Sequence, residues 1–218
     1  MPDLRLERAQ TGTVVGIDEA GRGPWAGPVA AAAVVLDAER LPDSLRNGLD
    51  DSKKLRPARR AELYAVLSGY ARIGVGVAEA EEIDAVNILA ATMAAMARAV
   101  ENLGIAPDSA LVDGNRAPAL PCPATCVVRG DGQSLSIAAA SVVAKVTRDR
   151  LMADLARVHP GYGWERNAGY GTAEHRAALE RLGVSPQHRR SFAPVLNILR
   201  RSGDRLPDVE PPRQPLSP

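Results

Sequence analysis

The chain has 218 residues, of which 45% are hydrophobic and 24% charged, and its 27 basic and 26 acidic residues leave a formal net charge of +1. This composition is typical of a globular protein with a sizeable core. The near balance of charge excludes a strongly basic nucleic-acid binder, and an aromatic content of 3% argues against a single-strand binder built on stacked bases. Two cysteines are too few for a disulfide scaffold or a four-cysteine zinc site.

The first half of the chain predicts three strands and two helices. Short apolar runs, each bounded by glycine, proline or charged residues, predict strands at 13–18, 29–36 and 72–78. Apolar residues at helical spacing predict helices at 57–67 and 83–103. The first of these helices opens with a proline and the second stops at Gly104, as helix ends commonly do. The segment 41–55 is expected to be a polar loop.

The second half predicts two more strands, one long helix and two short ones. The strands are expected at 110–113 and 124–128, and the helices at 135–158, 172–182 and 193–201. The last 16 residues, 203–218, contain five prolines and no periodicity, so they are expected to form a disordered tail. The alternation of strands and helices predicts an α/β fold with one mixed sheet covered by helices.

Two predicted strands end in carboxylates that are followed by glycine. Asp18 ends the first strand and is followed by Glu19, and Asp113 ends the fourth. Ligands collect at strand ends in α/β sheets, and several clustered acids repel one another unless a cation is present. Carboxylates without histidine or cysteine favour Mg²⁺ or Mn²⁺. Each acid alone could equally be a turn former or a helix cap, and Asp18 and Glu19 share a site only if the strand ends there.

Glycine and arginine follow these acids directly, as Gly21-Arg22-Gly23. Glycines allow a backbone to approach a ligand closely, and arginine pairs with phosphate. A plain tight turn would explain the tripeptide in isolation. Its position beside an acidic pair favours a substrate clamp.

Basic residues gather in three places, which suggests contacts with a phosphate backbone. They are Lys53, Lys54, Arg56, Arg59 and Arg60, then Lys145, Arg148 and Arg150, and finally His188, Arg189 and Arg190. A solvated face is the simpler explanation for any one of these runs. Three aromatic residues lie among glycines, Tyr162, Trp164 and Tyr170, and could fill the edge of a core or stack on a sugar or base, the role expected of Tyr170.

Taken in order, these motifs resemble those of bacterial ribonuclease HII. The matching segments are GIDEAGRGP at 16–24, DSKKL at 51–55, NILAATM at 87–93, VDGN at 112–115, SIAAASVVAKVTRD at 136–149, GYGT at 169–172 and HRRSF at 188–192. The resemblance implies a ribonuclease H-like catalytic domain over 1–158 and a small helical C-terminal portion over 159–202 that completes the substrate site. It also implies cleavage of the RNA strand of RNA–DNA hybrids and incision of DNA at embedded ribonucleotides.

The resemblance assigns roles to individual residues. Asp18, Glu19 and Asp113 resemble the metal-binding acids, and Asp131 the fourth catalytic acid, with Asp149 as the competing candidate. The residues that resemble substrate contacts are Gly21, Arg22, Gly23, Lys53, Ser141, Lys145 and Tyr170. The family often has His-Lys where Asn167-Ala168 stand here, which removes one possible phosphate contact.

The mechanism that the resemblance implies is hydrolysis with two Mg²⁺ or Mn²⁺ ions roughly 3.5–4 Å apart. One ion activates water and the other stabilises the leaving oxygen. The cut falls on the 5′ side of a ribonucleotide and leaves a 3′-hydroxyl and a 5′-phosphate.

Two other classes of function remain open from the residues alone. One is a non-catalytic module of the same fold that binds RNA–DNA hybrids, although concentrated acids would repel the phosphates it must hold. The other is a phosphotransferase or ATPase, which would require a phosphate-binding glycine loop that is absent from the sequence. The sequence shows no secretory signal and no apolar stretch long enough for a membrane span, so a cytoplasmic protein without membrane contact is expected. The protein is also expected to be a monomer.

Overall fold

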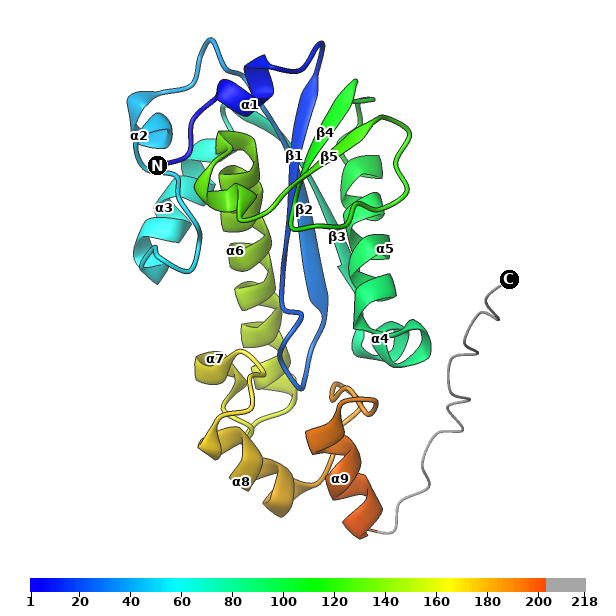
Figure 1. Ribbon diagram of the computed structural model, residues 1–218. Helices are drawn as coiled ribbons and strands as arrows, with labels where there is room; N and C mark the ends of the chain where they lie inside the picture. Colours follow the sequence, from blue (N-terminus) through cyan, green and yellow to red (C-terminus); the bar gives the residue numbers. More distant parts are fainter. Residues whose placement is uncertain (203–218) are drawn as a thin grey trace, which may run out of the picture.

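The computed structural model describes residues 1–202, which form one five-stranded sheet with helices on both faces (Figure 1). The strands are β1 Val14–Ala20, β2 Val29–Leu36, β3 Ala71–Ala78, β4 Ser109–Asp113 and β5 Ala124–Val127. The helices are α1 Arg5–Arg8, α2 Asp43–Arg46, α3 Pro57–Leu67, α4 Ala80–Val86, α5 Ile88–Glu101, α6 Leu135–Val158, α7 Trp164–Asn167, α8 Ala173–Leu182 and α9 Ala193–Ser202, and a 3-10 turn η1 covers Gly130–Gly132.

The sheet is mixed, as the sequence predicts, with the strand order β3-β2-β1-β4-β5. Strands β1, β2 and β3 pair antiparallel, whereas β4 and β5 run parallel to β1. In the β1–β4 pair, Ile17 lies opposite Val112. The next residues along the two strands, Asp18 and Asp113, therefore lie side by side at the same end of the sheet.

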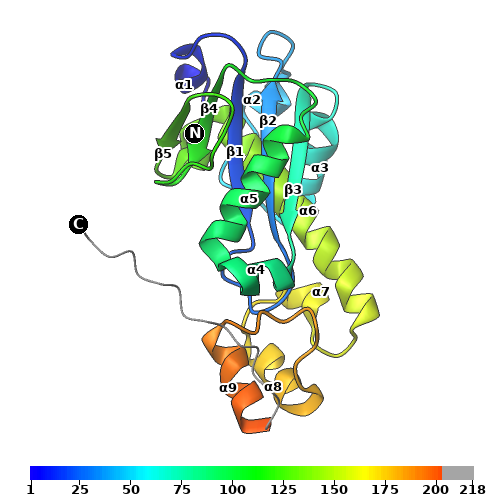
Figure 2. The same ribbon diagram turned by 90° about the vertical axis from the view of Figure 1, so that its right-hand side faces the viewer.

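Two apolar cores hold the helices against the sheet. Helices α6 and α3 cover one face, where Val34, Leu63 and Val142 are fully or almost fully buried. Helix α5 covers the other face, where Ile17 and Met96 lie in the second core. Figure 2 shows the same arrangement from the side, with α5 in front of the sheet and α6 behind it. Alanines at 138–140 give α6 a narrow face that packs closely on the strands.

The structure differs from the sequence prediction at the helix expected over 83–103 and at three short helices that were not predicted, α1, α2 and α7. The helix expected at 83–103 is two helices, α4 and α5, because Asn87 adopts φ 70° and ψ 163°, which no helix accommodates. The Asn87 side chain accepts hydrogen bonds from the amides of Leu89 and Ala90 and so begins α5. The segment expected to be a loop at 41–55 contains the short helix α2, and α1 was not predicted.

The C-terminal helices α7, α8 and α9 lie at one end of the molecule, beneath the connection between β1 and β2 (Figure 1). Tyr162 and Trp164 are buried there and stack with ring centroids 5.0 Å apart. Both therefore fill a core and cannot stack on nucleic acid from these positions. The tail expected at 203–218 lies outside the described residues. None of the helices in residues 1–202 has the length and apolar composition needed to cross a membrane.

Candidate active site

Two aspartates from neighbouring strands form the centre of the candidate site. Asp18 on β1 is 5% exposed, and its Oδ1 accepts a hydrogen bond of 2.7 Å from the backbone amide of Glu19. Asp113 ends β4, and its Oδ1 accepts one of 2.6 Å from the amide of Gly130. Since Ile17 packs in the α5 core, the alternation of side chains turns Asp18 to the α6 face, towards Ser141.

The side chain of Glu19 projects from the face of β1 opposite to that of Asp18. The condition set by the sequence, that the strand end at Asp18, is not met, because β1 continues to Ala20, which pairs with Ala30 of β2. Glu19 still lies beside the other acids, since β4 stops at Asp113 and leaves this side of β1 without a neighbour. Its Oε1 forms an ion pair of 3.4 Å with Nη1 of Arg22.

The acids strongly perturb one another. Burial first, and then the charges of Glu19 and Asp113, raise the pKa of Asp18 well above its ordinary value. Burial and the charge of Asp113 raise the pKa of Glu19, although Arg22 opposes the shift. Two buried acids that resist ionisation beside a third carboxylate form an environment that a divalent cation would relieve, so the donor chemistry fits Mg²⁺ or Mn²⁺.

The carboxylates are close enough to interact, but they are not gathered into a finished ligand set. Within residues 1–202, no three histidine, cysteine, aspartate or glutamate side chains stand in a geometry that would hold a metal ion as they lie.

Asp131 and Asp149, the two candidates for a fourth acid, lie in different surroundings. Asp131 lies on η1 and is 9% exposed, and burial followed by the charges of Asp51 and Asp113 raises its pKa to about 6. Asp149 instead binds the Lys145 ammonium one turn away and forms an ion pair of 3.6 Å with Arg60. The surroundings therefore favour Asp131, with Asp149 in the ion pair that its spacing from Lys145 suggests.

Lys53 and a pair of serines lie beside the acids. Partial burial opposes the charged form of Lys53, but Asp51, Asp18, Asp131 and Asp113 together raise its pKa above the ordinary value. Lys53 therefore interacts with the whole acidic group. The hydroxyl of Ser141 donates to that of Ser52 over 2.9 Å, which ties the loop that carries Lys53 to α6.

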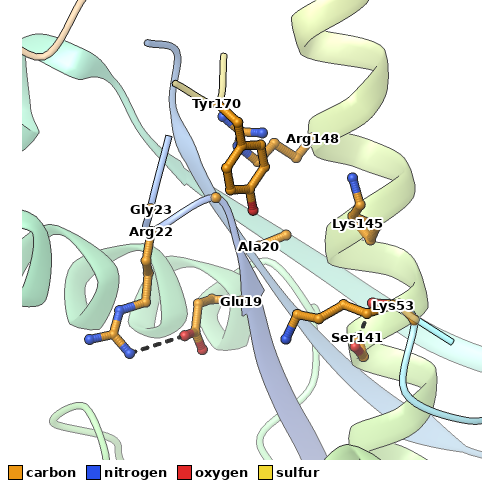
Figure 3. Close-up of a pocket in the computed structure, with 11 residues that line it drawn as sticks. Glu19, Ala20, Arg22, Gly23, Lys53, Ser141, Lys145, Arg148 and Tyr170 are labelled. Atoms are coloured by element: carbon orange, nitrogen blue, oxygen red, sulfur yellow. Dashed lines mark hydrogen bonds and ion pairs between the residues drawn. The ribbon is translucent and has the colours of Figure 1, made fainter. Parts of the chain in front are cut away.

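A cavity of about 340 Å³ opens beside Glu19 (Figure 3). It is lined by Glu19, Ala20, Gly21, Arg22, Gly23, Ser52, Lys53, Ser141, Lys145, Arg148 and Tyr170. All seven residues expected to contact substrate are in this lining. Tyr170 is 46% exposed and stands over the cavity, in contrast to the buried Tyr162 and Trp164.

Three arginines from the basic clusters have structural contacts. Arg60 is buried and donates to the backbone carbonyls of Ser52 and Leu55. Arg189 is fully buried and Arg148 almost so, and both also bind backbone carbonyls. The expectation of phosphate contacts is wrong for Arg60 and Arg189, which do not line the cavity. A buried guanidinium bound to carbonyls cannot be distinguished from a surface one by sequence alone.

The sequence interpretation missed some site residues and the support of Tyr170. Asp51 contacts Asp131 through a hydrogen bond between the carboxyl groups, and Ser52 lines the cavity. Both belong to the DSKKL segment at 51–55, in which the lysines alone indicated contacts with phosphate. The backbone carbonyl of Tyr170 bonds to Nδ1 of the buried His175 over 3.0 Å, a contact that no motif indicates.

The sequence matches known proteins along most of its length. A family model described as Ribonuclease HII matches residues 15–195. The chain is 65% identical over 199 residues to the ribonuclease HII of Paramagnetospirillum magneticum, covering 91% of this chain and 99% of that protein. It is 63% identical over 204 residues to the ribonuclease HII of Rhodospirillum rubrum, covering 93% and 94%.

Solved structures agree with this result. The ribonuclease H2 of Pyrococcus horikoshii OT3 superposes with a TM-score of 0.70 at 27% identity, covering 87% of this chain and 98% of that one. A Bst-RNase HIII solved in complex with Mn²⁺ gives a TM-score of 0.69 at 17% identity, covering 90% and 72%, and shows the shared fold. The fold is therefore the expected ribonuclease H-like one. The chain belongs to the ribonuclease HII family, and is a metal-dependent endonuclease of the ribonuclease H type.

Proposed function

We propose that the chain hydrolyses the RNA strand of RNA–DNA hybrids and incises duplex DNA on the 5′ side of an embedded ribonucleotide, leaving a 3′-hydroxyl and a 5′-phosphate. One observation carries the proposal. The cavity beside the acids is lined by the Gly21–Gly23 backbone, by Lys53 and Lys145 and by the exposed ring of Tyr170. A nucleic-acid strand there would meet cations along its phosphates and an aromatic ring at one sugar.

Asp18, Glu19 and Asp113 are the proposed metal ligands, and Asp131 is the fourth catalytic acid. Two Mg²⁺ or Mn²⁺ ions would supply activation of the attacking water and stabilisation of the leaving oxygen. The protein's own contribution is to hold the carboxylates. The Glu19 amide fixes Asp18, the Gly130 amide fixes Asp113, and Asp131 lies on a turn next to Gly130.

On the substrate side, Lys53, Lys145 and Ser141 are proposed to contact phosphates. Gly21, Arg22 and Gly23 are proposed to approach the ribonucleotide, and Tyr170 to pack against the neighbouring sugar. We also propose that the protein acts as a monomer, with 1–158 as the catalytic domain and 159–202 as a helical portion that completes the substrate site. The contact of His175 with the Tyr170 carbonyl supports this division of labour, because it fixes the loop above the cavity.

A non-catalytic hybrid binder of the same fold is less consistent with the site. A protein that only binds nucleic acid gains nothing from burying acids whose mutual repulsion raises their pKa values, and those acids would repel the backbone it binds.

The test is single-turnover cleavage, with Mg²⁺, of an end-labelled duplex that carries one ribonucleotide. Asp113→Asn should fold normally, because the amide oxygen still accepts from Gly130, and should abolish cleavage. Asp131→Asn should lower kcat, whereas Asp149→Asn should act on KM through the freed Lys145. Asp154→Asn, an exposed acid at the far end of α6, is the control and should cleave normally. Wild-type protein that binds the duplex without cutting it would establish the alternative function.

A further inference from the structure

A buried arginine forms hydrogen bonds to the backbone of the connection between β1 and β2. Arg189, which precedes α9, is 0% exposed and lies behind the connection. Its guanidinium donates to the carbonyls of Gly27 (2.9 Å, from Nε), Arg22 (2.9 Å, from Nη1), Gly21 (2.6 Å, from Nη2) and Pro28 (3.1 Å, from Nη2). One side chain from the C-terminal portion therefore binds both ends of the segment between Gly21 and Pro28.

A second arginine completes this support. Arg148 of α6 donates to the carbonyls of Pro28 (2.9 Å), Ala168 (2.9 Å) and Ala26 (3.2 Å), so the two guanidinium groups share the Pro28 oxygen. Neither arginine forms an ion pair with a carboxylate in the described part of the chain. Burial lowers the pKa of Arg189 to about 9 and that of Arg148 to about 10, so both stay charged at neutral pH.

Burying two cations without a carboxylate is costly, and an apolar core would avoid that cost. A guanidinium offers something that apolar side chains lack, five donors in a rigid plane. Here those donors determine which way the peptide units of the connection turn.

The orientation of these peptide units determines which backbone groups face the cavity. The C=O and N–H groups of a trans peptide unit point in opposite directions. Because Arg189 draws the carbonyls of Gly21 and Arg22 inward, the amides of Arg22 and Gly23 point away from it, on the side of the cavity that these residues line. Neither amide donates to an acceptor within residues 1–202, so both are available to an oxygen of a ligand.

We propose that Arg189 is a positioning residue that sets the Arg22 and Gly23 amides to bind the 2′-hydroxyl oxygen of the ribonucleotide. This inference rests on the proposed function and extends it to a residue that never touches substrate. It predicts that Arg189 controls the preference for ribose over deoxyribose, while general affinity for duplex depends on the surface lysines.

The decisive variant is Arg189→Lys, which keeps a positive charge but cannot reproduce a planar fork that binds four carbonyls. Kd is measured for two duplexes of one sequence, one with a single ribonucleotide and one entirely DNA, in an Asp113→Asn background that prevents cleavage. The ratio of the two Kd values is expected to fall by about tenfold, the equivalent of one hydrogen bond, while affinity for the all-DNA duplex is unchanged. Arg46→Lys is the matched control, because Arg46 also binds two backbone carbonyls, in a loop remote from the cavity, and the ratio should not change.

A purely structural role for Arg189 gives a different result. The melting temperature would fall, but the folded fraction would keep its preference for the ribonucleotide, and the proposal would be overturned. If Arg189→Lys does not fold, amide NMR of the Asp113→Asn protein with wild-type Arg189 decides the question. The Arg22 and Gly23 amide shifts should then change with the ribonucleotide duplex and not with the all-DNA duplex, and equal shifts with both would refute the proposal. Failure of the proposed function is recognised separately, by wild-type protein that neither cleaves nor prefers the ribonucleotide.

Discussion

Gly21 and Gly23 belong to one tripeptide but are constrained for different reasons. A Cβ on Gly21 would lie 1.9 Å from Nε of Arg148, and the residue has φ +98°. A Cβ on Gly23 would meet nothing closer than Cε1 of Tyr170 at 3.7 Å, an ordinary contact at the edge of the cavity. The protein itself therefore requires glycine at 21, whereas its own packing leaves the space beside residue 23 open.

Gly23→Ala is expected to fold with an unchanged melting temperature and to cleave about a hundredfold more slowly, because a misplacement of about 1 Å is enough for such a loss. Gly21→Ala is expected to lower the melting temperature, because the new methyl group displaces a buried guanidinium. Thermal melts and single-turnover rates measured on the same preparations distinguish the two. Normal cleavage by Gly23→Ala would show that no substrate atom approaches this position.

Tyr170 and Trp164 offer a second contrast between aromatic residues of one region. Tyr170→Ala should reduce cleavage at a lone ribonucleotide and hardly affect stability, because the ring is 46% exposed over the cavity. Trp164→Ala should lower the free energy of unfolding by about 3–5 kcal/mol, since this ring is 1% exposed and donates a hydrogen bond to His175. Urea denaturation and cleavage assays separate these effects, and a Tyr170→Ala protein that loses stability but not specific activity would assign Tyr170 to the core.

At the scale of elements, periodicity predicted the sheet and the long helices because their apolar patterns are local. Periodicity failed where the backbone conformation of a single residue ends a helix. Asn87 interrupts an amphipathic pattern that is otherwise continuous from Ile83, and the pattern carries no sign of a φ of 70°. Helix α1 was missed for another reason. Its Glu7 accepts hydrogen bonds from Ser134 and Ser136 at the start of α6, a contact across 129 positions of sequence.

The same distinction between local patterns and distant contacts applies to the residues of the candidate site. The acids were predictable, since the clear apolar patterns of β1 and β4 run directly into carboxylates. The contributions of Asp51 and Arg189 were not, because each depends on which distant backbone it meets after folding. Residue type therefore indicated the chemistry of the site, and the fold decided which charges face substrate and which hold the chain.

The break between α4 and α5 at Asn87 can be tested by substitution of this residue. Asn87→Ala loses the cap on the Leu89 and Ala90 amides and places a Cβ-bearing residue without that compensation at positive φ, so the free energy of unfolding should fall by about 1–3 kcal/mol. Asn87→Gly should cost less, because glycine adopts this conformation freely. Urea denaturation measures both. Equal losses for the two variants would show that the cap alone, and not the backbone conformation, matters here.

Charge is distributed unevenly over a molecule whose net charge is only +1. Affinity for duplex should therefore fall steeply with salt through the local cations at the cavity. Lys53→Ala should flatten the slope of log Kd against log salt concentration by about 0.9. Arg40→Ala, a 72% exposed arginine paired with Asp37 at the opposite end of β2, should leave the slope unchanged. Identical slopes for wild type and Lys53→Ala would place this lysine outside the phosphate path.

The acidic cluster also links the stability of the whole metal-free protein to pH. The pKa of Asp131 is about 6 in the folded state and near 3.8 when unfolded, so between these values the folded state binds more protons. Its contribution to stability is therefore fully present below about pH 4 and is lost as the pH rises through 6. At pH 7 the ionised carboxylate costs up to about 3 kcal/mol, which a neutral amide would avoid.

Asp131→Asn should consequently be more stable than wild type at pH 7 in the presence of EDTA, and the difference should close as the pH falls towards 4. The buried His175 and His188 have the opposite effect on stability, because their lowered pKa values make the folded state less stable in acid. This effect is the same in wild type and in Asp131→Asn, so it cancels when the two proteins are compared at the same pH. Urea denaturation at pH 7, 5.5 and 4 provides the measurement, and a difference that stays constant over this range would mean that Asp131 is not held among the other acids.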